Sequence, residues 1–303
     1  MVFYKYHGAG NDFLIADGRN ENIDLDAGRI AALCDRHTGI GADGVMVLER
    51  GDGCDFRMRY YNSDGSGGMM CGNGGRCIVA FAADLGFTHF SFEAPDGPHI
   101  AELVGGASSA FSSEPRIVLL KMKDVTGAVP YPAPDGKRDW FLDTGTRHLV
   151  RFVDDVASYD VVGEGRKLRN DSRFAPVGTN VNFVQVNADG GSQVPERMSI
   201  VVRTFEKGVE DETLACGTGI VASSMASWLD VSLPHLTEGV ATDCQVCVEV
   251  RARISDLSVR FRPAIDVSSD DVSGDGLSER AASFRASDVW LEGPAAYIAK
   301  IEI

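Results

Sequence analysis

The sequence predicts two similar domains, each combining β-strands with a helix that begins directly after a cysteine. Residues 56–80 and 202–222 form an internal repeat that aligns on Cys71 and Cys216, with Cys-Gly-Asn-Gly in the first copy and Cys-Gly-Thr-Gly in the second. A strand-like segment precedes each cysteine (residues 59–62 and 203–206), and an apolar run typical of a helix follows it. A repeat longer than the usual solenoid period indicates two similar domains rather than an array. The 303 residues suffice for two domains that each bury a core.

The cysteine motif has the chemistry of an anion-binding helix start. Its glycines allow a tight turn and leave backbone N–H groups open. A helix that begins there presents unpaired N–H groups and a partial positive charge, which ease loss of the thiol proton and bind a carboxylate. A single Cys-Gly-x-Gly is equally compatible with a tight turn around a buried small residue. Two copies in matched strand–loop–cysteine–helix settings favour the chemical interpretation.

Two facing thiols of this kind suit the inversion of a stereocentre. One thiolate removes a proton from a carbon and the opposing thiol returns a proton to the other face, without a cofactor. Because the α-proton of an amino acid is very weakly acidic, the developing carbanion needs fixed dipoles in a dry site. Two helix N-termini aimed at the substrate carboxylate supply them. The motifs therefore predict a small-molecule amino acid as substrate.

Composition and charge restrict the class of protein. Hydrophobic residues make up 44% and charged residues 24% of the chain, and the net charge of −15 argues against a nucleic-acid partner. No apolar run approaches the roughly 20 residues that span a bilayer, and the first residues lack a secretory pattern, so we expect a cytoplasmic protein with no membrane partner. Seven cysteines argue against a disulfide framework. Cys244 and Cys247 form a lone CxxC on a strand-like pattern, which we interpret as structural rather than as a metal site.

Along the first half, strands and helices follow from hydrophobic patterning. Residues 2–17 predict two short strands broken at 8–11, where Asn11 sits on a turn with an amide that could bind a ligand. Helices are expected at 26–36 and from Cys71 to about Leu85. The remaining strands are expected at 44–48, 88–93, 99–103 and 116–123.

The second half has fewer clear signals. Residues 130–136 are rich in turn formers and predict a domain junction, and strands are expected at 140–142 and 149–153. His148 ends the Gly-containing loop between those strands and, taken alone, is interpreted as structural. Asn180 and Asn182 lie on an otherwise apolar strand, where each needs a hydrogen-bond partner. Residues 264–287 are rich in Ser, Asp and Gly and predict a mobile surface insertion, followed by strand patterning to the end.

These motifs resemble the diaminopimelate epimerase family. The matching segments are HGAGNDF at 7–13, GIGADG at 39–44, YYNSDGS at 60–66, CGNGGRC at 71–77, TNVNF at 179–183 and ETLACGTG at 212–219. The resemblance implies an α+β fold of two pseudo-symmetric domains, each a curved, mostly antiparallel sheet wrapped around a central helix. We expect residues 1–125 to form the domain with Cys71 and residues 126–293 the domain with Cys216, while a C-terminal strand at 294–303 returns to the first.

The resemblance also implies an activity and a site. It predicts a PLP-independent isomerase, with no cofactor and no metal, that converts LL-2,6-diaminopimelate to meso-diaminopimelate in lysine and peptidoglycan biosynthesis, as a homodimer. Cys71 and Cys216 are implied as the acid/base thiols, with His148 and Glu206 beside them to tune protonation. The implied substrate ligands are Asn11, Asn62, Gly72, Asn73, Asn180, Glu206, Lys207, Gly217 and Thr218, and Glu206 is placed to bind the substrate amine.

The sequence departs from the family pattern at three points. Lys207 stands where the family generally has Arg, so a bidentate carboxylate contact becomes a point charge. The family's Gly-Asn-Pro-His loop reads Gly-Thr-Arg-His, which places Thr146 and Arg147 at its centre. The segment from Glu206 to Cys216 is one residue longer than the commonest form. These changes leave the two thiols in place and bear on substrate selectivity.

Three alternatives follow from the same residues. A two-thiol racemase or epimerase of a different amino acid keeps the chemistry and changes the substrate. A Cys–His hydrolase would use Cys216 as nucleophile and His148 as base, and would leave Cys71 without a role. A catalytically inactive binding module would not need both thiols and both glycine loops.

Overall fold

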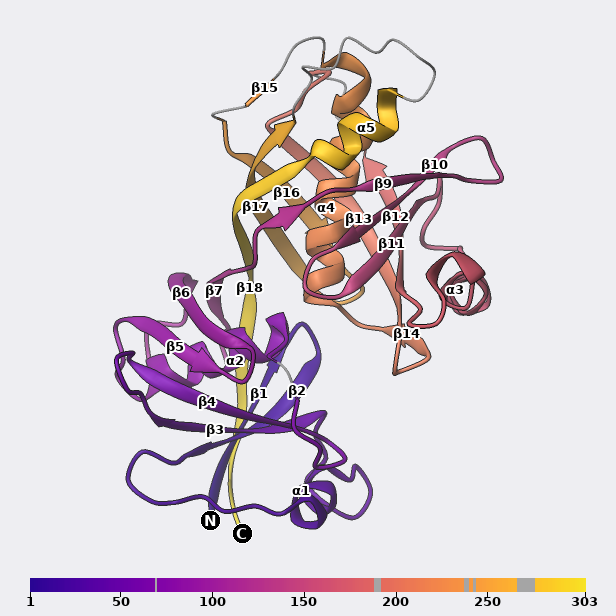
Figure 1. Ribbon diagram of the computed structural model, residues 1–303. Coiled ribbons are helices and arrows are strands. Elements are labelled where there is room, and N and C mark those ends of the chain that lie inside the picture. The colour runs from indigo at the N-terminus through magenta and orange to yellow at the C-terminus, as the bar shows by residue number, and fades with distance from the viewer. Residues whose placement is uncertain (69, 188–191, 237–239, 242–243, 266–275) are drawn as a thin grey trace. The chain divides into compact units, whose positions relative to one another are not determined.

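The computed structural model describes residues 1–68, 70–187, 192–236, 240–241, 244–265 and 276–303 (Figure 1). The chain divides into two compact units. Unit 1 comprises Met1–Lys121 and Glu292–Ile303, and unit 2 comprises Met122–Leu291. The long last strand, β18 (Arg285–Glu302), supplies residues to both units. That residues 1–125 and 126–293 fold as independent domains stays a prediction.

Unit 1 is a mostly antiparallel sheet with two helices. Its strands are β1 (Val2–Gly8), β2 (Asn11–Asp17), β3 (Gly44–Arg50), β4 (Phe56–Asn62), β5 (Phe90–Ala94), β6 (Gly97–Gly106), β7 (Arg116–Lys121) and the end of β18. Its helices are α1 (Ala27–Cys34) and α2 (Gly72–Asp84). Neighbouring strands pair antiparallel except for β2 with β3 and β4 with β5, which are parallel, and β1 also pairs antiparallel with the end of β18.

Unit 2 is likewise built from β-strands and helices. Its strands are β8 (Val125–Thr126), β9 (Val129–Pro132), β10 (Arg138–Asp143), β11 (Arg147–Phe152), β12 (Asn180–Asn187), β13 (Arg197–Glu206), β14 (Asp211–Thr213), β15 (Val240–Ala241), β16 (Val246–Arg251), β17 (Asp256–Ile265) and the start of β18. Its helices are α3 (Val161–Arg169), α4 (Gly217–Ser232) and α5 (Gly276–Ser283), with short 3-10 turns at Ser172–Phe174 and Leu233–His235.

The two units repeat one topology. The strands β1 to β6 pair in the order antiparallel, parallel, antiparallel, parallel, antiparallel, and β10, β11, β12, β13, β16 and β17 pair in the same order. A helix follows the second strand of each series (α1 or α3), and a second helix follows the fourth (α2 or α4). This repetition confirms the predicted α+β fold with pseudo-symmetric halves.

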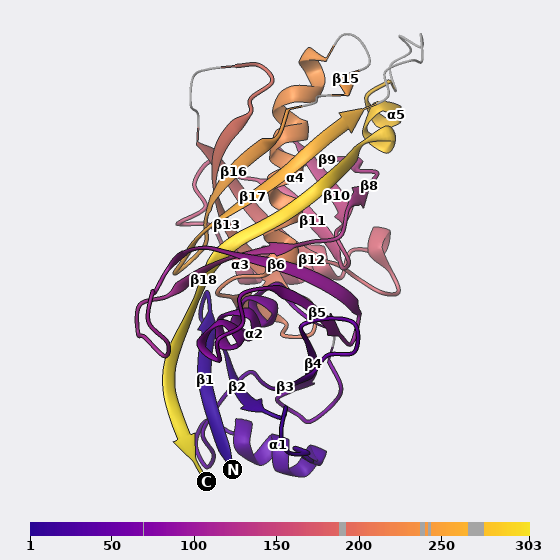
Figure 2. The same cartoon turned by 90° about the vertical axis from the view of Figure 1, so that its left-hand side faces the viewer.

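Each sheet encloses the helix that begins after its cysteine. Helix α2 contacts β1, β2, β3 and β7, and α4 contacts β10, β11, β12, β13, β16 and β17. Residues 72–82 of α2 are buried without interruption, and almost all of α4 is buried as well. A helix that is apolar and covered on all sides belongs in a core. Figures 1 and 2 both show α4 within the strands of its own unit, so each cysteine lies where a buried central helix begins.

One local expectation was wrong and another was confirmed in part. The insertion expected at 264–287 is ordered in its described part, because residues 276–283 form α5 and Ala281, Phe284 and Ala286 are buried in the core of unit 2. Residues 266–275 lie outside the described residues. The turn expected at 130–136 is found in the residues after Pro132, where it follows β9, which pairs with β10, and the domain junction near this segment stays a prediction. In both segments a few apolar side chains outweigh the turn-forming composition.

Among the described residues, none of the helices combines the length and apolarity needed to cross a membrane.

Candidate active site

In unit 1, Cys71 is the N-cap of α2. Its backbone is extended (φ −106°, ψ 156°), and its Sγ accepts a hydrogen bond from the Gly74 N–H at 3.3 Å. A thiol in this position replaces the serine or aspartate oxygen that usually caps a helix. Gly72 and Asn73, the first two residues of the helix, are buried beside it. The predicted cysteine at a helix start is therefore realised with the sulfur at the positive end of the helix dipole.

Asn11 is held against Cys71 by a network of charges. Its Nδ2 donates to Asp43 Oδ2 at 2.6 Å, which turns its Oδ1 toward Cys71 Sγ, 3.9 Å away. The neighbouring Asp12 is bound by Lys5 and Arg36. Burial opposes ionisation of Asp12, but the hydrogen bonds from Arg36 and Lys5 prevail and hold the pKa of its carboxyl below the usual value. The β1–β2 turn that carries Asn11 is thus fixed by an ion-pair cluster.

The motif after Cys71 contains a residue that sequence reasoning missed. Arg76 is completely buried and donates from Nη2 to Asn73 Oδ1 at 2.7 Å, while its Nε reaches Pro294 O at 3.4 Å. Its Nη1 has no hydrogen-bond partner within the described parts of the chain. Burial lowers the pKa of Arg76, and negative charge on Cys77 or Cys71 opposes that shift. The sequence signal that could have found it is an arginine inside an otherwise apolar run, because a buried charged side chain requires hydrogen-bond or charge partners.

Asn62 ends β4 in a tight turn. Its Nδ2 donates to Ser66 Oγ at 3.0 Å, and its backbone N–H bonds to Ser66 O. Gly68, which follows the turn, lies so close to the Tyr60 ring that a Cβ there would meet ring carbons at 2.2 Å. Only glycine allows the loop to pass this close to the ring. The turn therefore places Asn62 at the end of the strand that precedes Cys71.

In unit 2, Cys216 is the residue before α4, but its sulfur makes no side-chain capping bond to the helix. Its Sγ lies 3.5 Å from Thr218 Oγ1. The Thr218 carbonyl accepts a hydrogen bond from Thr144 Oγ1 at 2.9 Å, which fixes the first turn of the helix, including Gly217. The two cysteines therefore share a position relative to their helices and differ in that the Cys71 sulfur caps its helix whereas the Cys216 sulfur does not.

His148 is completely buried at the start of β11 and lies next to this helix. Its Nε2 is 2.9 Å from Thr146 Oγ1 and 3.0 Å from Thr218 Oγ1. Burial lowers the pKa of His148 from its ordinary value of 6.5 to about 3, so the ring is neutral near pH 7. Thr146 occupies the loop position that departs from the family pattern. Its hydroxyl and that of Thr218 therefore both contact the same ring nitrogen, His148 Nε2.

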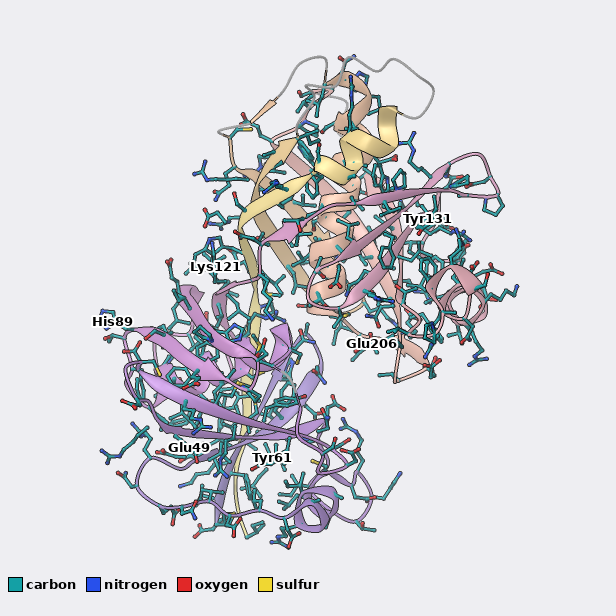
Figure 3. The ribbon with its side chains drawn as sticks, viewed as in Figure 1. Glu49, Tyr61, His89, Lys121, Tyr131 and Glu206 are labelled. Atoms are coloured by element: carbon teal, nitrogen blue, oxygen red, sulfur yellow. The ribbon has the colours of Figure 1, made fainter. Side chains whose placement is uncertain are left out.

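Asn180, Glu206 and Lys207 meet at the neighbouring strand ends. Asn180 Nδ2 donates to Arg147 O at 3.1 Å, and its Oδ1 accepts the Lys207 N–H at 2.9 Å. The parallel register of β11 and β12 sets His148 beside Asn180. Glu206 is the half-buried last residue of β13 (Figure 3). The predicted residues of unit 2 therefore gather where β11, β12, β13 and α4 converge, as those of unit 1 gather around the start of α2.

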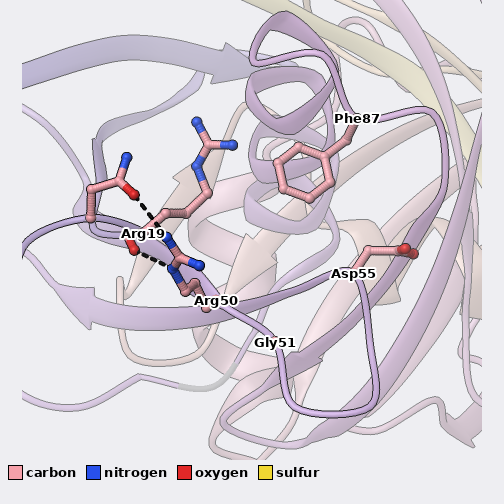
Figure 4. Close-up of a pocket in the computed structure, with 6 residues that line it drawn as sticks. Arg19, Arg50, Gly51, Asp55 and Phe87 are labelled. Atoms are coloured by element: carbon pink, nitrogen blue, oxygen red, sulfur yellow. Dashed lines mark hydrogen bonds between the residues drawn. The ribbon is translucent and has the colours of Figure 1, made fainter.

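Other features of the structure lie apart from these residues. A cavity of about 450 Å³ in unit 1 is lined by Arg19, Asn20, Arg50, Gly51, Asp55 and Phe87 (Figure 4). None of these lining residues was predicted to belong to the site. All seven cysteines fall in the described part of the chain, and none forms a disulfide. Within that part, no group of three or more His, Cys, Asp or Glu side chains could hold a metal ion.

Comparison with known proteins supplies the family context. The family model described as diaminopimelate epimerase matches residues 3–108 and 140–246. A diaminopimelate epimerase of Chlorobaculum tepidum is 42% identical over 228 residues, which cover 73% of this chain and 81% of that protein. One from Flavobacterium psychrophilum is 42% identical over 229 residues, covering 75% and 81%. A PhzF-family phenazine biosynthesis protein of Bacillus anthracis shares the fold with a TM-score of 0.63 at 12% identity, covering 100% of this chain and 98% of that one.

Proposed function

The chain belongs to the diaminopimelate epimerase family, and from this premise we propose that Cys71 and Cys216 are the two acid/base thiols of a cofactor-independent epimerisation. The enzyme is an isomerase that acts on diaminopimelate and converts the LL form to the meso form. The observation that carries the assignment is that each unit begins its buried central helix directly after one cysteine.

The proposed reaction needs only two proton transfers. The thiolate of one cysteine takes the α-proton as the C–H bond breaks, and the electron pair stays on the α-carbon next to the carboxylate. The thiol of the other cysteine gives its proton to the opposite face of that carbon, which inverts the stereocentre. The enzyme is left with the proton on the first sulfur and the charge on the second. The reverse reaction exchanges the two roles.

Helix starts are suited to hold the substrate carboxylate during these steps. The first N–H groups of α2 and α4 belong to Gly72, Asn73, Gly217 and Thr218. Such groups bind anions because no residue within the helix accepts their hydrogen bonds. Fixed dipoles of this kind also stabilise charge that develops in a transition state. We assign these four residues to the carboxylate at the reacting carbon.

The remaining substrate ligands hold the other groups of the substrate. Asn11, Asn62 and Asn180 offer side-chain amides, each positioned by a hydrogen bond to its own unit. Glu206 supplies a carboxylate for a substrate amine, and Lys207 a point charge for a carboxylate. Diaminopimelate has an amino acid group at each end, so it needs ligands for the end that does not react.

The Cys–His hydrolase alternative is weakened by the surroundings of His148. In such enzymes the imidazole takes the proton of the thiol directly. Here both contacts of His148 Nε2 are threonine hydroxyls, and burial lowers the pKa of the ring to about 3. A ring with so low a proton affinity is a poor base for a thiol. The hydrolase would also leave Cys71 without a role.

Deuterium exchange at the α-carbon tests the two-thiol proposal. In D₂O the enzyme should convert LL-diaminopimelate to the meso form with deuterium at the inverted centre, and Cys71→Ala or Cys216→Ala should each abolish epimerisation. Cys54→Ala is the matched control, because that half-buried thiol bonds to Phe56 O in unit 1 and should be dispensable. Full epimerisation by either active-site variant would refute the two-base scheme. Faster turnover of a single-ended amino acid than of diaminopimelate would favour the alternative substrate.

We further propose that the enzyme works in the cytoplasm as a homodimer, as expected from the family resemblance. Light scattering coupled to size-exclusion chromatography measures the mass in solution, for which one chain contributes 32.5 kDa. A species of twice that mass at assay concentrations is the expected result. A fully active species with the mass of one chain would refute the dimer.

A further inference from the structure

We propose that Asn182 is a positioning residue that orders a chain of hydrogen bonds running through His148 to the hydroxyl of Thr218, which then donates to the Cys216 sulfur. This inference rests on the proposed function only in taking Cys216 as an acid/base thiol. It assigns a purpose to a second asparagine of β12 and adds a side-chain role for Thr218. The residues involved all belong to unit 2.

The orientation of the Asn182 amide follows from its partners. The side chain is completely buried, its Oδ1 accepts from Thr204 Oγ1 at 2.9 Å, and its Nδ2 lies 3.2 Å from Leu149 O. Because a carbonyl oxygen only accepts hydrogen bonds, the amide nitrogen must face Leu149. The same nitrogen lies 3.1 Å from His148 Nδ1 and has a second hydrogen to donate there. His148 Nδ1 is therefore an acceptor.

The tautomer of His148 then follows. A neutral imidazole carries its one proton on the nitrogen that does not accept, which here is Nε2. Nε2 therefore donates toward Thr146 Oγ1 and Thr218 Oγ1, whose oxygens are 3.1 Å apart. In the proposed chain this bond reaches Thr218 Oγ1 directly, or through a Thr146 hydroxyl that donates onward to Thr218, so that Thr218 Oγ1 accepts a hydrogen bond and keeps its own hydrogen.

That hydrogen has the Cys216 sulfur within reach. Thr218 Oγ1 and Cys216 Sγ are 3.5 Å apart, a normal length for a hydrogen bond to sulfur, and the bond from Thr144 to the Thr218 carbonyl fixes the threonine backbone. A donor at this point favours the thiolate over the thiol, because a hydrogen bond to the charged form lowers its energy. The chain thus supplies a neutral donor without bringing a formal charge to the sulfur.

The close packing of α4 against β12 shows that the contact is built into the fold. A Cβ on Gly219 would lie 2.4 Å from Asn182 Oδ1 and 3.2 Å from His148 Cε1. Only glycine lets the first turn of the helix approach the amide and the ring this closely. The adjoining strand ends carry the ionisable residues Asp143, Arg147, His148, Glu206, Lys207 and Asp211, and the variants proposed below retain all of them.

Asn182→Asp should reverse the direction of the hydrogen bonds in this network, because aspartate has nearly the same shape as asparagine but carries no amide donor. An aspartate accepts from Nδ1–H, so the His148 proton moves to Nδ1 and Nε2 becomes an acceptor. A threonine hydroxyl then donates to Nε2 instead of passing its hydrogen toward the sulfur. Thr218→Val removes the terminal donor, and Thr218→Ser retains it. Asn187→Asp, at the exposed far end of β12, is the matched control for the added charge.

Two measurements that do not require turnover test the proposal. The pH profile of Cys216 alkylation by iodoacetamide, followed by peptide mass spectrometry, should shift upward by about one pH unit in Thr218→Val and Asn182→Asp, a tenfold loss of thiolate. Thr218→Ser and Asn187→Asp should match the parent. ¹⁵N NMR of the wild-type enzyme should place the His148 proton on Nε2, and on Nδ1 in Asn182→Asp.

The outcomes separate this inference from the proposed function. A wild-type proton on Nδ1, or identical alkylation profiles for Thr218→Val and Thr218→Ser, would overturn the hydrogen-bond chain, and neither result depends on the folding of Asn182→Asp. Retention of epimerisation by Cys216→Ala would instead refute the catalytic assignment of that thiol. Either result can be obtained without the other.

Discussion

The buried neutral His148 should make the stability of unit 2 depend on pH. Its pKa falls from 6.5 in an unfolded chain to about 3 in the folded protein. Between these values the unfolded state binds a proton that the folded state does not. The stabilisation that the neutral ring contributes to the folded state is therefore fully present above pH 6.5 and is lost as the pH falls toward 3.

The size of the effect follows from the same two values. Lowering the pH from 7.5 to 5 protonates the unfolded histidine almost fully and the folded one hardly at all. At about 1.4 kcal/mol per pH unit, the loss over this range is about 2 kcal/mol. His148→Asn removes this titrating group. Between pH 7.5 and pH 5, the free energy of unfolding of the variant should therefore fall by about 2 kcal/mol less than that of the wild type. Other titrating groups contribute equally to both proteins and cancel in the difference.

Tryptophan fluorescence is a selective assay for this prediction. All three tryptophans, Trp140, Trp228 and Trp290, lie in unit 2, so urea unfolding followed by fluorescence reports on that unit. His37→Asn is the matched control, since His37 is exposed in unit 1 and should leave the fluorescence transition unchanged at both pH values. Parallel pH dependences of the wild type and His148→Asn would refute the claim that a neutral ring is buried in the folded state.

Two further predictions concern the helix starts. Arg76→Met removes a buried charge that lies near Cys71 and holds Asn73, so the pH profile of Cys71 alkylation should move up by about one pH unit, and Arg76→Lys should move it less. An unchanged profile in Arg76→Met would show that the charge does not act on the thiol. Gly219→Ala should destabilise unit 2 by about 1–3 kcal/mol in the fluorescence assay, because its Cβ overlaps Asn182 Oδ1. Wild-type stability in that variant would mean that the first turn of α4 can move away.

Local patterns in the sequence were enough to locate the two helices that begin after a cysteine. Glycines after a cysteine followed by an apolar run predicted where α2 and α4 begin, because helix starts depend on residues close in sequence. Alternating or apolar runs likewise indicated most of the strands. The expected end of the helix after Cys71, near Leu85, agrees with α2, which ends at Asp84.

Long-range contacts could not be predicted in the same way. The position of Asn182 on an apolar strand predicts that its side chain needs a hydrogen-bond partner. The identity of that partner depends on the parallel pairing of β11 with β12, which are connected by a crossover through α3. The sequence shows Arg76 only as a charged residue within a predicted helix, and the enclosing sheet shows that the helix has no exposed surface there. The composition of residues 264–287 suggested a loop because the buried Ala281 and Phe284 are few among many polar residues.

The surroundings of the two thiols make sense for a reaction that runs in both directions. In the proposed reaction each sulfur acts as base in one direction and as acid in the other, so a thiolate stabilised too strongly on one side would stop the reaction there. A cation in direct contact lowers a thiol pKa by several units, as in enzymes that need a permanent thiolate. In this protein a neutral group contacts each sulfur: the Gly74 N–H donates to Cys71 Sγ, and the Thr218 hydroxyl lies 3.5 Å from Cys216 Sγ.

Two ionisable residues contact neighbours of the thiols. Arg76 binds Asn73 rather than Cys71, and His148 is kept neutral by burial and binds Thr218 rather than Cys216. Amide and hydroxyl dipoles stabilise a thiolate less than a formal charge does. Such dipoles let the proton leave either sulfur without trapping the charge on one of them. Burying His148 therefore suits the proposed reaction although it costs stability at low pH, since a protonated ring beside Thr218 would stabilise the Cys216 thiolate and oppose the return of a proton to that sulfur.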